Sequence, residues 1–321
     1  MGRYIARQLA SIIPTILLSI VINFMLLHAA PGDPARVMAG RDNPTDEQIA
    51  AISERLGLDD PLPVQFWNYV KEIAQGNLGQ SLAFKQPVFD LIMERLPATL
   101  LLTVTSSILA VMIGTLLGVI AAQRSGGTLD SALSFGNYAL FALPAFWLGL
   151  ILIVVFSSKL GWLPTSGMRN VRADYTGWRD VLDVAQHMVL PVTTLALVQV
   201  PIFFRITRAS VMQQQREDYV TTLRATGMPE SKVFRGYALR NALLPTVTVF
   251  GLGLGFVFTG AALVEIVFAW PGIGRLTLDA VFRRDYPLLL GVYLILAIAV
   301  SVAVLLTDIV YAFLDPRIRL R

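Results

Sequence analysis

The sequence predicts an all-α polytopic membrane protein, and three observations support this prediction. Of the 321 residues, 55% are hydrophobic and only 15% are charged, whereas about a quarter of a soluble domain is charged. Each of six charge-free runs, 21 to 27 residues long, could cross a bilayer as a helix: Leu9–Ala30, Ala98–Ala122, Ala132–Ser158, Val184–Phe204, Asn241–Val264 and Tyr286–Thr307. The runs lack the alternation of β-barrel strands, so helices must satisfy the backbone.

The first run shares features with a secretory signal, because Arg3 and Arg7 precede it and it ends on His28-Ala29-Ala30. The apolar region of such a signal spans only about 7–15 residues, and here Pro31 would directly follow the cut. We therefore expect residues 1–30 to hold an uncleaved first span.

The distribution of charge predicts that both termini are cytoplasmic. With that orientation the inside segments carry 13 basic and six acidic residues, and the outside segments carry 13 basic and 15 acidic residues. The inside segments are also much shorter, so their Lys and Arg density is higher, as the positive-inside rule requires. No inside segment combines a basic run with stacking aromatics, so we expect no nucleic-acid partner.

Three segments are predicted to lie outside: about residues 31–97, 159–183 and 265–287. In the largest, Thr45-Asp46-Glu47-Gln48 is a capping-box pattern that opens a helix to Leu56, with Gly57 placed to end it. A second amphipathic helix is expected from Pro63 to Ala74, ending at Gly76. Two such helices cannot fold alone, so we expect them to pack on the membrane helices as a lid or docking surface.

One inside loop is long, from Arg205 to Leu244. Helix formers over Ser210–Ala225 precede a break at Gly227-Met228-Pro229, and a second helical stretch runs on to Leu244. A helix pair held at the membrane face suits docking of a partner. Anchoring of its arginines to membrane lipid phosphate explains these features equally well.

Motifs for catalysis or metal binding are missing from the sequence. It contains no phosphate-binding G-x-x-x-x-G-K-[ST] pattern, no cysteine and only two histidines, His28 and His187, near opposite ends of different spans. The glycine spacings Gly114-x-x-x-Gly118 and Gly251-x-x-x-Gly255 lie inside apolar runs, where they are typical of close helix packing. We expect no catalytic residue, no metal site and no cofactor on this chain.

An ion-coupled carrier would need charge at the bilayer midplane, and here Glu265 and Asp308 lie only at the edges of spans. Most uncharged polar residues in the spans will hold helices together. A minority are expected to line a pathway or gate, and the candidates are Asn137, Gln199, Thr248, Thr259 and Glu265.

An ordered set of short motifs covers nearly the whole chain: Pro31-Gly32-Asp33-Pro34, Gly76-Asn77-Leu78-Gly79-Gln80-Ser81, Pro144-Ala145-Phe146-Trp147, Gly161-Trp162-Leu163-Pro164, Glu217-Asp218-Tyr219-Val220, Ala225-Thr226-Gly227, Arg240-Asn241-Ala242-Leu243-Leu244-Pro245, Trp270-Pro271-Gly272-Ile273-Gly274, Arg284-Asp285-Tyr286-Pro287 and Asp315-Pro316-Arg317. The set resembles the permease subunits of bacterial ATP-binding-cassette (ABC) importers in the dipeptide/oligopeptide/nickel branch, in particular the B-type dipeptide permease. Departures from the branch pattern stand at Asn77, Leu223, Thr226 and Tyr237.

The resemblance implies a type I importer permease fold. It places the permease core at residues 98–312, an extracytoplasmic helical insertion at 31–97, a cytoplasmic tail at 313–321 and a cytoplasmic coupling loop at about 210–244. The residues expected to couple this loop to an ATPase are Glu217, Asp218, Tyr219, Arg224, Ala225, Gly227, Arg240 and Asn241.

The same resemblance implies the partners and the location. They are a homologous second permease forming a heterodimer, two ATPase subunits that bind ATP and Mg, and an extracytoplasmic binding protein, all at a bacterial inner membrane. Peptides are the leading substrate class, and glutathione, a nickel chelate or haem remain alternatives. An ion-coupled secondary carrier, an intramembrane enzyme and a scaffold without transport are more remote, because the sequence lacks the residues for the first two and the scaffold leaves the loop pattern unexplained.

Overall fold

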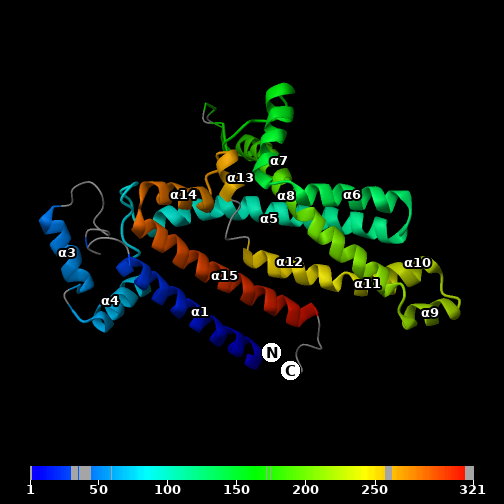
Figure 1. Ribbon diagram of the computed structural model, residues 1–321, viewed down its shortest axis with the longest axis horizontal. Helices are drawn as coiled ribbons and strands as arrows, with labels where there is room; N and C mark the ends of the chain where they lie inside the picture. The colour runs from blue at the N-terminus through cyan, green and yellow to red at the C-terminus, as the bar shows by residue number, and fades with distance from the viewer. Residues whose placement is uncertain are drawn as a thin grey trace. The chain divides into compact units, whose positions relative to one another are not determined.

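The computed structural model describes residues 2–29, 35, 45–58, 60–170, 172–173, 175–256 and 262–314. The regular elements within these ranges are helices, accompanied by one isolated antiparallel bridge between Gln80 and Pro87 (Figure 1). The chain divides into two compact units. Unit 1 comprises residues 1–99, 258–262 and 271–321, and unit 2 comprises residues 100–257 and 263–270.

Unit 1 is built around a long helix pair. Helix α1 (Gly2–Ala29) lies alongside α15 (Tyr286–Leu314), as Figure 1 shows in blue and red. The buried Asn23 side chain joins them, because its Nδ2 donates to the Leu290 carbonyl at 3.1 Å. An amide that would be costly in an apolar contact is thereby satisfied.

The helices within the predicted outer insertion are α3 (Asp46–Leu56) and α4 (Leu62–Ala74). Helix α4 packs on the end of α1: the Phe66 ring meets Phe24 edge-on at 5.4 Å, and His28 Nε2 lies 2.8 Å from Gln65 Oε1. Both helices end one or two residues before the predicted glycines. Gly57 and Gly76 each adopt a positive φ, +62° and +78°, which L side chains rarely accept.

Elsewhere in unit 1, hydrogen bonds join two motifs identified in the sequence, the one that ends at Ser81 and the one that contains Asp285. The buried Asp285 carboxylate, at the start of α15, accepts hydrogen bonds from Ser81 Oγ at 2.5 Å, the Ala83 N–H at 3.0 Å and the Leu288 N–H at 3.2 Å. Beside it is an apolar core formed by the start of α5 (Val88–Gln123), α14 (Ile273–Arg283) and α15: Val88, Leu91, Ile92, Ile273, Leu276, Ala280, Leu288 and Val292. The segment before α5 is thus fixed to the start of α15.

Unit 2 contains the remainder of α5 and the long helix α8 (Trp178–Gln214). The two helices approach closely at Gly114 and Gly118, where an added Cβ would lie 2.7 Å from the Val200 carbonyl oxygen and 2.8 Å from the Phe204 carbonyl oxygen. The prediction that these two glycines allow close packing is confirmed. Around them, Ala110, Ala196, Val200 and Phe203 form a buried core.

The other elements of unit 2 are shorter. They are α6 (Thr128–Ala142), α7 (Ala145–Leu152), η1 (Ile153–Lys159), α9 (Asp218–Ala225), α10 (Glu230–Lys232), η2 (Val233–Ala238), α11 (Leu239–Ala242), α12 (Leu244–Phe256) and α13 (Ala262–Val267). Elements η1 and η2 are π-helical.

Three helices are long and apolar enough to cross a membrane: α5, α8 and residues Tyr286–Leu305 of α15. A fourth is reached if α6 and the α7–η1 helix count together, and α1 holds a shorter apolar stretch, Ile13–His28. The helical membrane class is therefore confirmed. The number of six spans remains a prediction.

The apolar run Ala132–Ser158 does not form one continuous helix, because the chain bends by 103° between α6 and the α7–η1 helix. Leu143 is extended (φ −84°, ψ 130°) and precedes Pro144, which has no N–H and disfavours a helical conformation in the residue before it. The predicted helix Ser210–Ala225 is likewise two helices. Helix α8 ends at Gln214, and Glu217 is extended (φ −69°, ψ 146°) before α9 begins.

Candidate functional site

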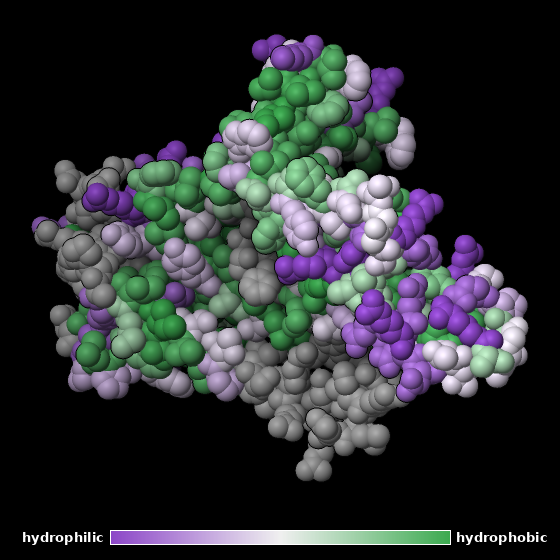
Figure 2. Space-filling model, turned by 45° about the vertical axis from the view of Figure 1, so that its right-hand side comes forward, coloured by the Kyte–Doolittle hydropathy of each residue, from purple (hydrophilic) through white to green (hydrophobic). Residues whose placement is uncertain are grey.

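The predicted coupling loop, residues 210–244, covers the end of α8, helix α9 and the elements up to α11. Its surface is polar: Figure 2 shows hydrophilic side chains gathered over α9 and α10 at the lower right, where Asp218, Arg224 and Glu230 are exposed. A polar projection of this kind can meet the surface of another protein.

The turn after α9 is a Schellman motif. The Gly227 N–H donates to the Arg224 carbonyl at 3.0 Å and the Met228 N–H to the Leu223 carbonyl at 3.3 Å, which satisfies two carbonyls at the helix end. Gly227 has a φ of +76°, and nothing lies within 4 Å of the position its Cβ would take. The sequence prediction that Gly227 permits this turn is confirmed.

An ion pair closes the same turn. The Arg224 guanidinium donates from Nε to Glu230 Oε2 at 2.9 Å and from Nη2 to Glu230 Oε1 at 2.7 Å. This bidentate bond holds the pKa of the Glu230 carboxyl below its ordinary value of 4.5 and raises the pKa of Arg224. Because both side chains are exposed, the pair orders the turn more than it stabilises the protein.

A small apolar core supports the loop from beneath. Val220 on α9 and Val233 and Ala238 on η2 are buried together, with Leu223 and Met228 packed against them. The two halves of the loop therefore form one packed body.

Tyr219 ties this body to the end of α8 and to α11. Its hydroxyl donates to Gln214 Oε1 at 2.7 Å and accepts from Asn241 Nδ2 at 3.3 Å. Residues separated by 27 positions in the sequence are thus held by one phenol. Two of the predicted coupling residues, Tyr219 and Asn241, are brought into contact here.

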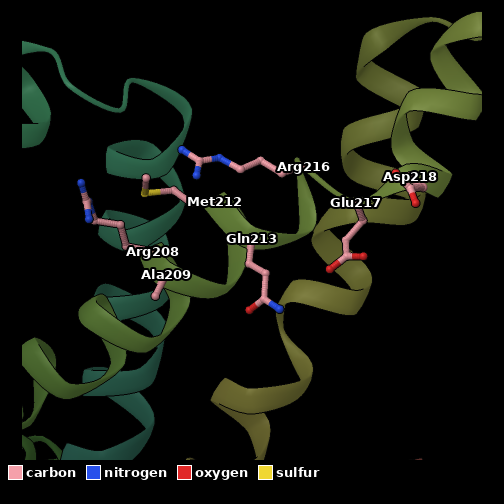
Figure 3. Close-up of a pocket in the computed structure, with 7 residues that line it drawn as sticks. All are labelled: Arg208, Ala209, Met212, Gln213, Arg216, Glu217 and Asp218. Carbon is pink, nitrogen blue, oxygen red and sulfur yellow. The ribbon is translucent and has the colours of Figure 1, made fainter.

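A cavity of about 530 Å³ opens between the end of α8 and the start of α9 (Figure 3). It is lined by Arg208, Ala209, Met212, Gln213, Arg216, Glu217 and Asp218. In Figure 3 the Arg216 side chain runs back along α8 past Met212, toward the side of Arg208. The cavity thus combines two guanidinium groups, two carboxylates and the apolar side chains of Ala209 and Met212, a mixture suited to polar side chains of a protein.

The remaining predicted coupling residues, Ala225 and Arg240, are exposed. Sequence reasoning missed five residues of the loop. Arg216 lines the cavity, Val220 and Val233 form the core beneath the loop, and Gln214 and Glu230 bind Tyr219 and Arg224. A signal for Glu230 was present, because an acid placed six residues after Arg224 across Gly-Met-Pro can reach back over a turn.

The predicted pathway residues are dispersed among helix contacts. The Asn137 amide donates to Leu133 on its own helix while its buried Oδ1 lacks a partner, and Thr248 donates to Leu244 one turn away. Gln199 accepts from Ser107 at 3.2 Å, which links α8 to α5. Glu265 is fully buried in α13, and Thr259 lies outside the described residues.

Within the described ranges, no three His, Cys, Asp or Glu side chains lie close enough together to hold a metal ion. Apolar helices of membrane-spanning length, joined to a packed polar loop, define the class as an α-helical membrane protein.

Family comparison specifies the class. Residues 114–320 match the family described as binding-protein-dependent transport system inner membrane component, and residues 1–103 match the N-terminal family of the same membrane components. The chain belongs to this family of transport permeases.

The curated relatives share the chain's full length. It is 39% identical to the di/tripeptide transport system permease protein DppB of Pseudomonas aeruginosa strain UCBPP-PA14, over 98% of each chain. It is also 39% identical to the oligopeptide transport system permease protein AppB of Bacillus subtilis strain 168, over 99% of each. The glutathione transport system permease protein GsiC of Salmonella typhimurium strain LT2 is 40% identical over 99% of each chain. The resemblance inferred from the motifs is confirmed.

Proposed function

We propose that this chain is the permease subunit of an ATP-driven, binding-protein-dependent importer of di- and oligopeptides, and that it forms half of the translocation pathway. The permeases for di- and tripeptides and for oligopeptides, each 39% identical over essentially the whole chain, support the substrate class. Glutathione is the second candidate, because a permease named for it is 40% identical. It is itself a short peptide.

The observation that carries the proposal is the construction of the coupling loop. A short polar helix, α9, is closed by a Schellman turn and an ion pair, packed on its own core and tied to α8 through Tyr219. A body packed in this way can pass a displacement on to α8 without deforming. Glu217, Asp218, Tyr219 and Arg224 would supply polar contacts to an ATPase subunit.

The other coupling residues have different tasks in this proposal. The small exposed side chain of Ala225 permits close approach, and Gly227 permits the turn. Arg240 would face the partner, and Asn241 keeps Tyr219 in place.

The proposed assembly holds a second, homologous permease, two ATPase subunits that bind ATP and Mg, and an extracytoplasmic binding protein. We place the complex in a bacterial inner membrane, with six spans, both termini cytoplasmic and residues 31–97 forming an outer helical insertion. The excess of positive charge on the inside segments supports this orientation. ATP would drive the change by binding one conformation of the assembly better than the other.

The test is reconstitution of the complex in nanodiscs and liposomes with candidate binding proteins charged from a peptide library that includes glutathione. Loaded binding protein should stimulate ATP hydrolysis and uptake, and mass spectrometry of the bound ligand identifies the substrate. Uptake that follows a proton or sodium gradient, with no ATPase co-purifying, would refute the proposal.

Two variants test the loop directly. Gly227→Pro replaces a φ of +76° by the fixed negative φ of proline, and Ala225→Arg adds bulk at the contact. Each should lower uptake per ATP by about tenfold while the complex still assembles. Gly76→Pro is the matched control, because Gly76 ends α4 with a φ of +78° and equally open space. Normal uptake by the Gly227→Pro variant would refute the coupling role proposed for this loop.

A further inference from the structure

A bidentate ion pair joins α6 to α8 close to the coupling loop. Arg208 donates from Nε to Asp130 Oδ1 and from Nη2 to Asp130 Oδ2, both at 2.7 Å. The Asp130 side chain is 6% exposed and that of Arg208 29% exposed. Short parallel bonds of this kind fix orientation as well as distance.

The same carboxylate also organises the turn between α5 and α6. Asp130 lies in the first turn of α6, where the helix dipole favours negative charge, and its Oδ2 accepts the Gly126 N–H at 2.9 Å. Ser134, one turn further along α6, donates its hydroxyl to Oδ1 at 3.4 Å. Asp130 therefore joins three pieces of chain: the α5–α6 turn, α6 and α8.

Arg208 is also part of the wall of the coupling-loop cavity. It lies on α8 two turns before Arg216, and both line the cavity (Figure 3). Below it, Val211 of α8 is buried with Ala122 of α5 and Ala242 of α11. Arg208 lies within the last two turns of α8, between the start of α9 and the ion pair to α6, and this pair adds to the packing of α6 on α8.

We propose that the Asp130–Arg208 pair is the joint that makes α6 and the coupling loop move as one body. Both are positioning residues. This role of the pair rests on the proposed function only in that ATP binding would supply the movement. Removal of Arg208 leaves a buried carboxylate without its cation, and removal of Asp130 leaves a partly exposed guanidinium without its anion. In either case this pair no longer makes α6 follow α8.

Because the chain contains no cysteine, spin labels can be placed on it, before assembly of the complex, without background from the chain itself. Ala132→Cys on α6 and Thr221→Cys on α9 are exposed positions on either side of the joint. In the full complex, the distance between these labels should be narrowly distributed and unchanged by a non-hydrolysable ATP analogue. Asp130→Asn and Arg208→Gln should each broaden the distribution and make it change with nucleotide.

Two further variants separate the joint from general loss of structure. The exchanged pair, Asp130→Arg with Arg208→Asp, keeps an ion pair but loses the bond to the Gly126 N–H, so it should give a narrower distribution than either single variant without reaching the wild-type width. Asp180→Asn is the matched control: the same substitution on α8, where Asp180 is half-buried and pairs with the exposed Arg169 at 3.2 Å, should leave the distribution unchanged. An unchanged distribution in both Asp130→Asn and Arg208→Gln, or a wild-type distance that changes with nucleotide, would overturn the proposal.

Peptide uptake per ATP hydrolysed gives the functional readout. It should fall at least about fivefold in Asp130→Asn and in Arg208→Gln, with no further fall in the double variant, because both remove one interaction. Additive losses would contradict a shared joint. If the wild-type complex shows no ATP-driven uptake, the proposed function fails, whereas the label distances still decide on the joint.

Discussion

Close packing of α5 on α8 gives a prediction whose size follows from the structure. In Gly118→Ala the new Cβ would lie 2.8 Å from the Phe204 carbonyl oxygen and 2.9 Å from Thr207 Cβ. Favourable carbon contacts begin at about 3.5 Å, so the helices must separate by about 0.7 Å or distort. Neither neighbouring atom can swing away, because one belongs to the backbone and the other is directly attached to it. Overpacking of this kind costs about 1–3 kcal/mol.

The matched controls are Gly136→Ala on α6 and Gly253→Ala on α12, where nothing lies within 4 Å of the position of the new Cβ. All three changes replace a helical glycine by alanine, so the gain in helix propensity, about 1 kcal/mol, cancels in the comparison. In unfolding of the purified complex by a denaturing detergent, Gly118→Ala should be less stable than either control by about 1–3 kcal/mol. Equal stabilities for the three variants would refute the packing argument.

Three other predictions concern the motifs and the turns. Asp285→Asn weakens three hydrogen bonds to a buried carboxylate and should lower the free energy of unfolding by about 1–3 kcal/mol. Ser81→Ala should cost less stability in the Asp285→Asn background than in the wild type, because both changes affect the same bond. Additive costs would contradict the shared bond. The lowered pKa of Glu230 means that its bond to Arg224 stabilises the turn above the ordinary pKa of 4.5 and that this stabilisation is lost as pH falls through the lowered value; hydrogen exchange of the turn amides should show this loss in the wild type and not in Glu230→Gln. Ala269→Gly should raise unfolding stability by about 1 kcal/mol, since Ala269 is held at a φ of +48°; no gain would show that this backbone is unstrained.

Helix ends were the most predictable local feature. Gly57, Gly76 and Gly227 were each expected to end a helix, and each does so with a positive φ. The signal is strong because glycine alone takes this conformation without steric cost. At Ala269 and Arg284 the chain makes the same turn with other residues, at φ of +48° and +54°, and no local pattern reveals this.

Helix continuity was less predictable. Apolar content alone merges α6 with the α7–η1 helix, although Pro144 divides them by a bend of 103°. Helix formers alone likewise merge α8 with α9, although Glu217 is extended between them. Hydropathy averages over a window, whereas a break depends on the backbone angles of one or two residues.

The sequence by itself determined the helical membrane class and the family, because composition, apolar run length and ordered motifs are properties of the chain alone. Only the tertiary structure decided which side chains meet. Asp130 and Arg208 are 78 residues apart, and Ser81 and Asp285 are 204 apart. Pairing at such separations depends on which helices pack together and at what rotation, and the sequence pattern within either helix does not contain that information.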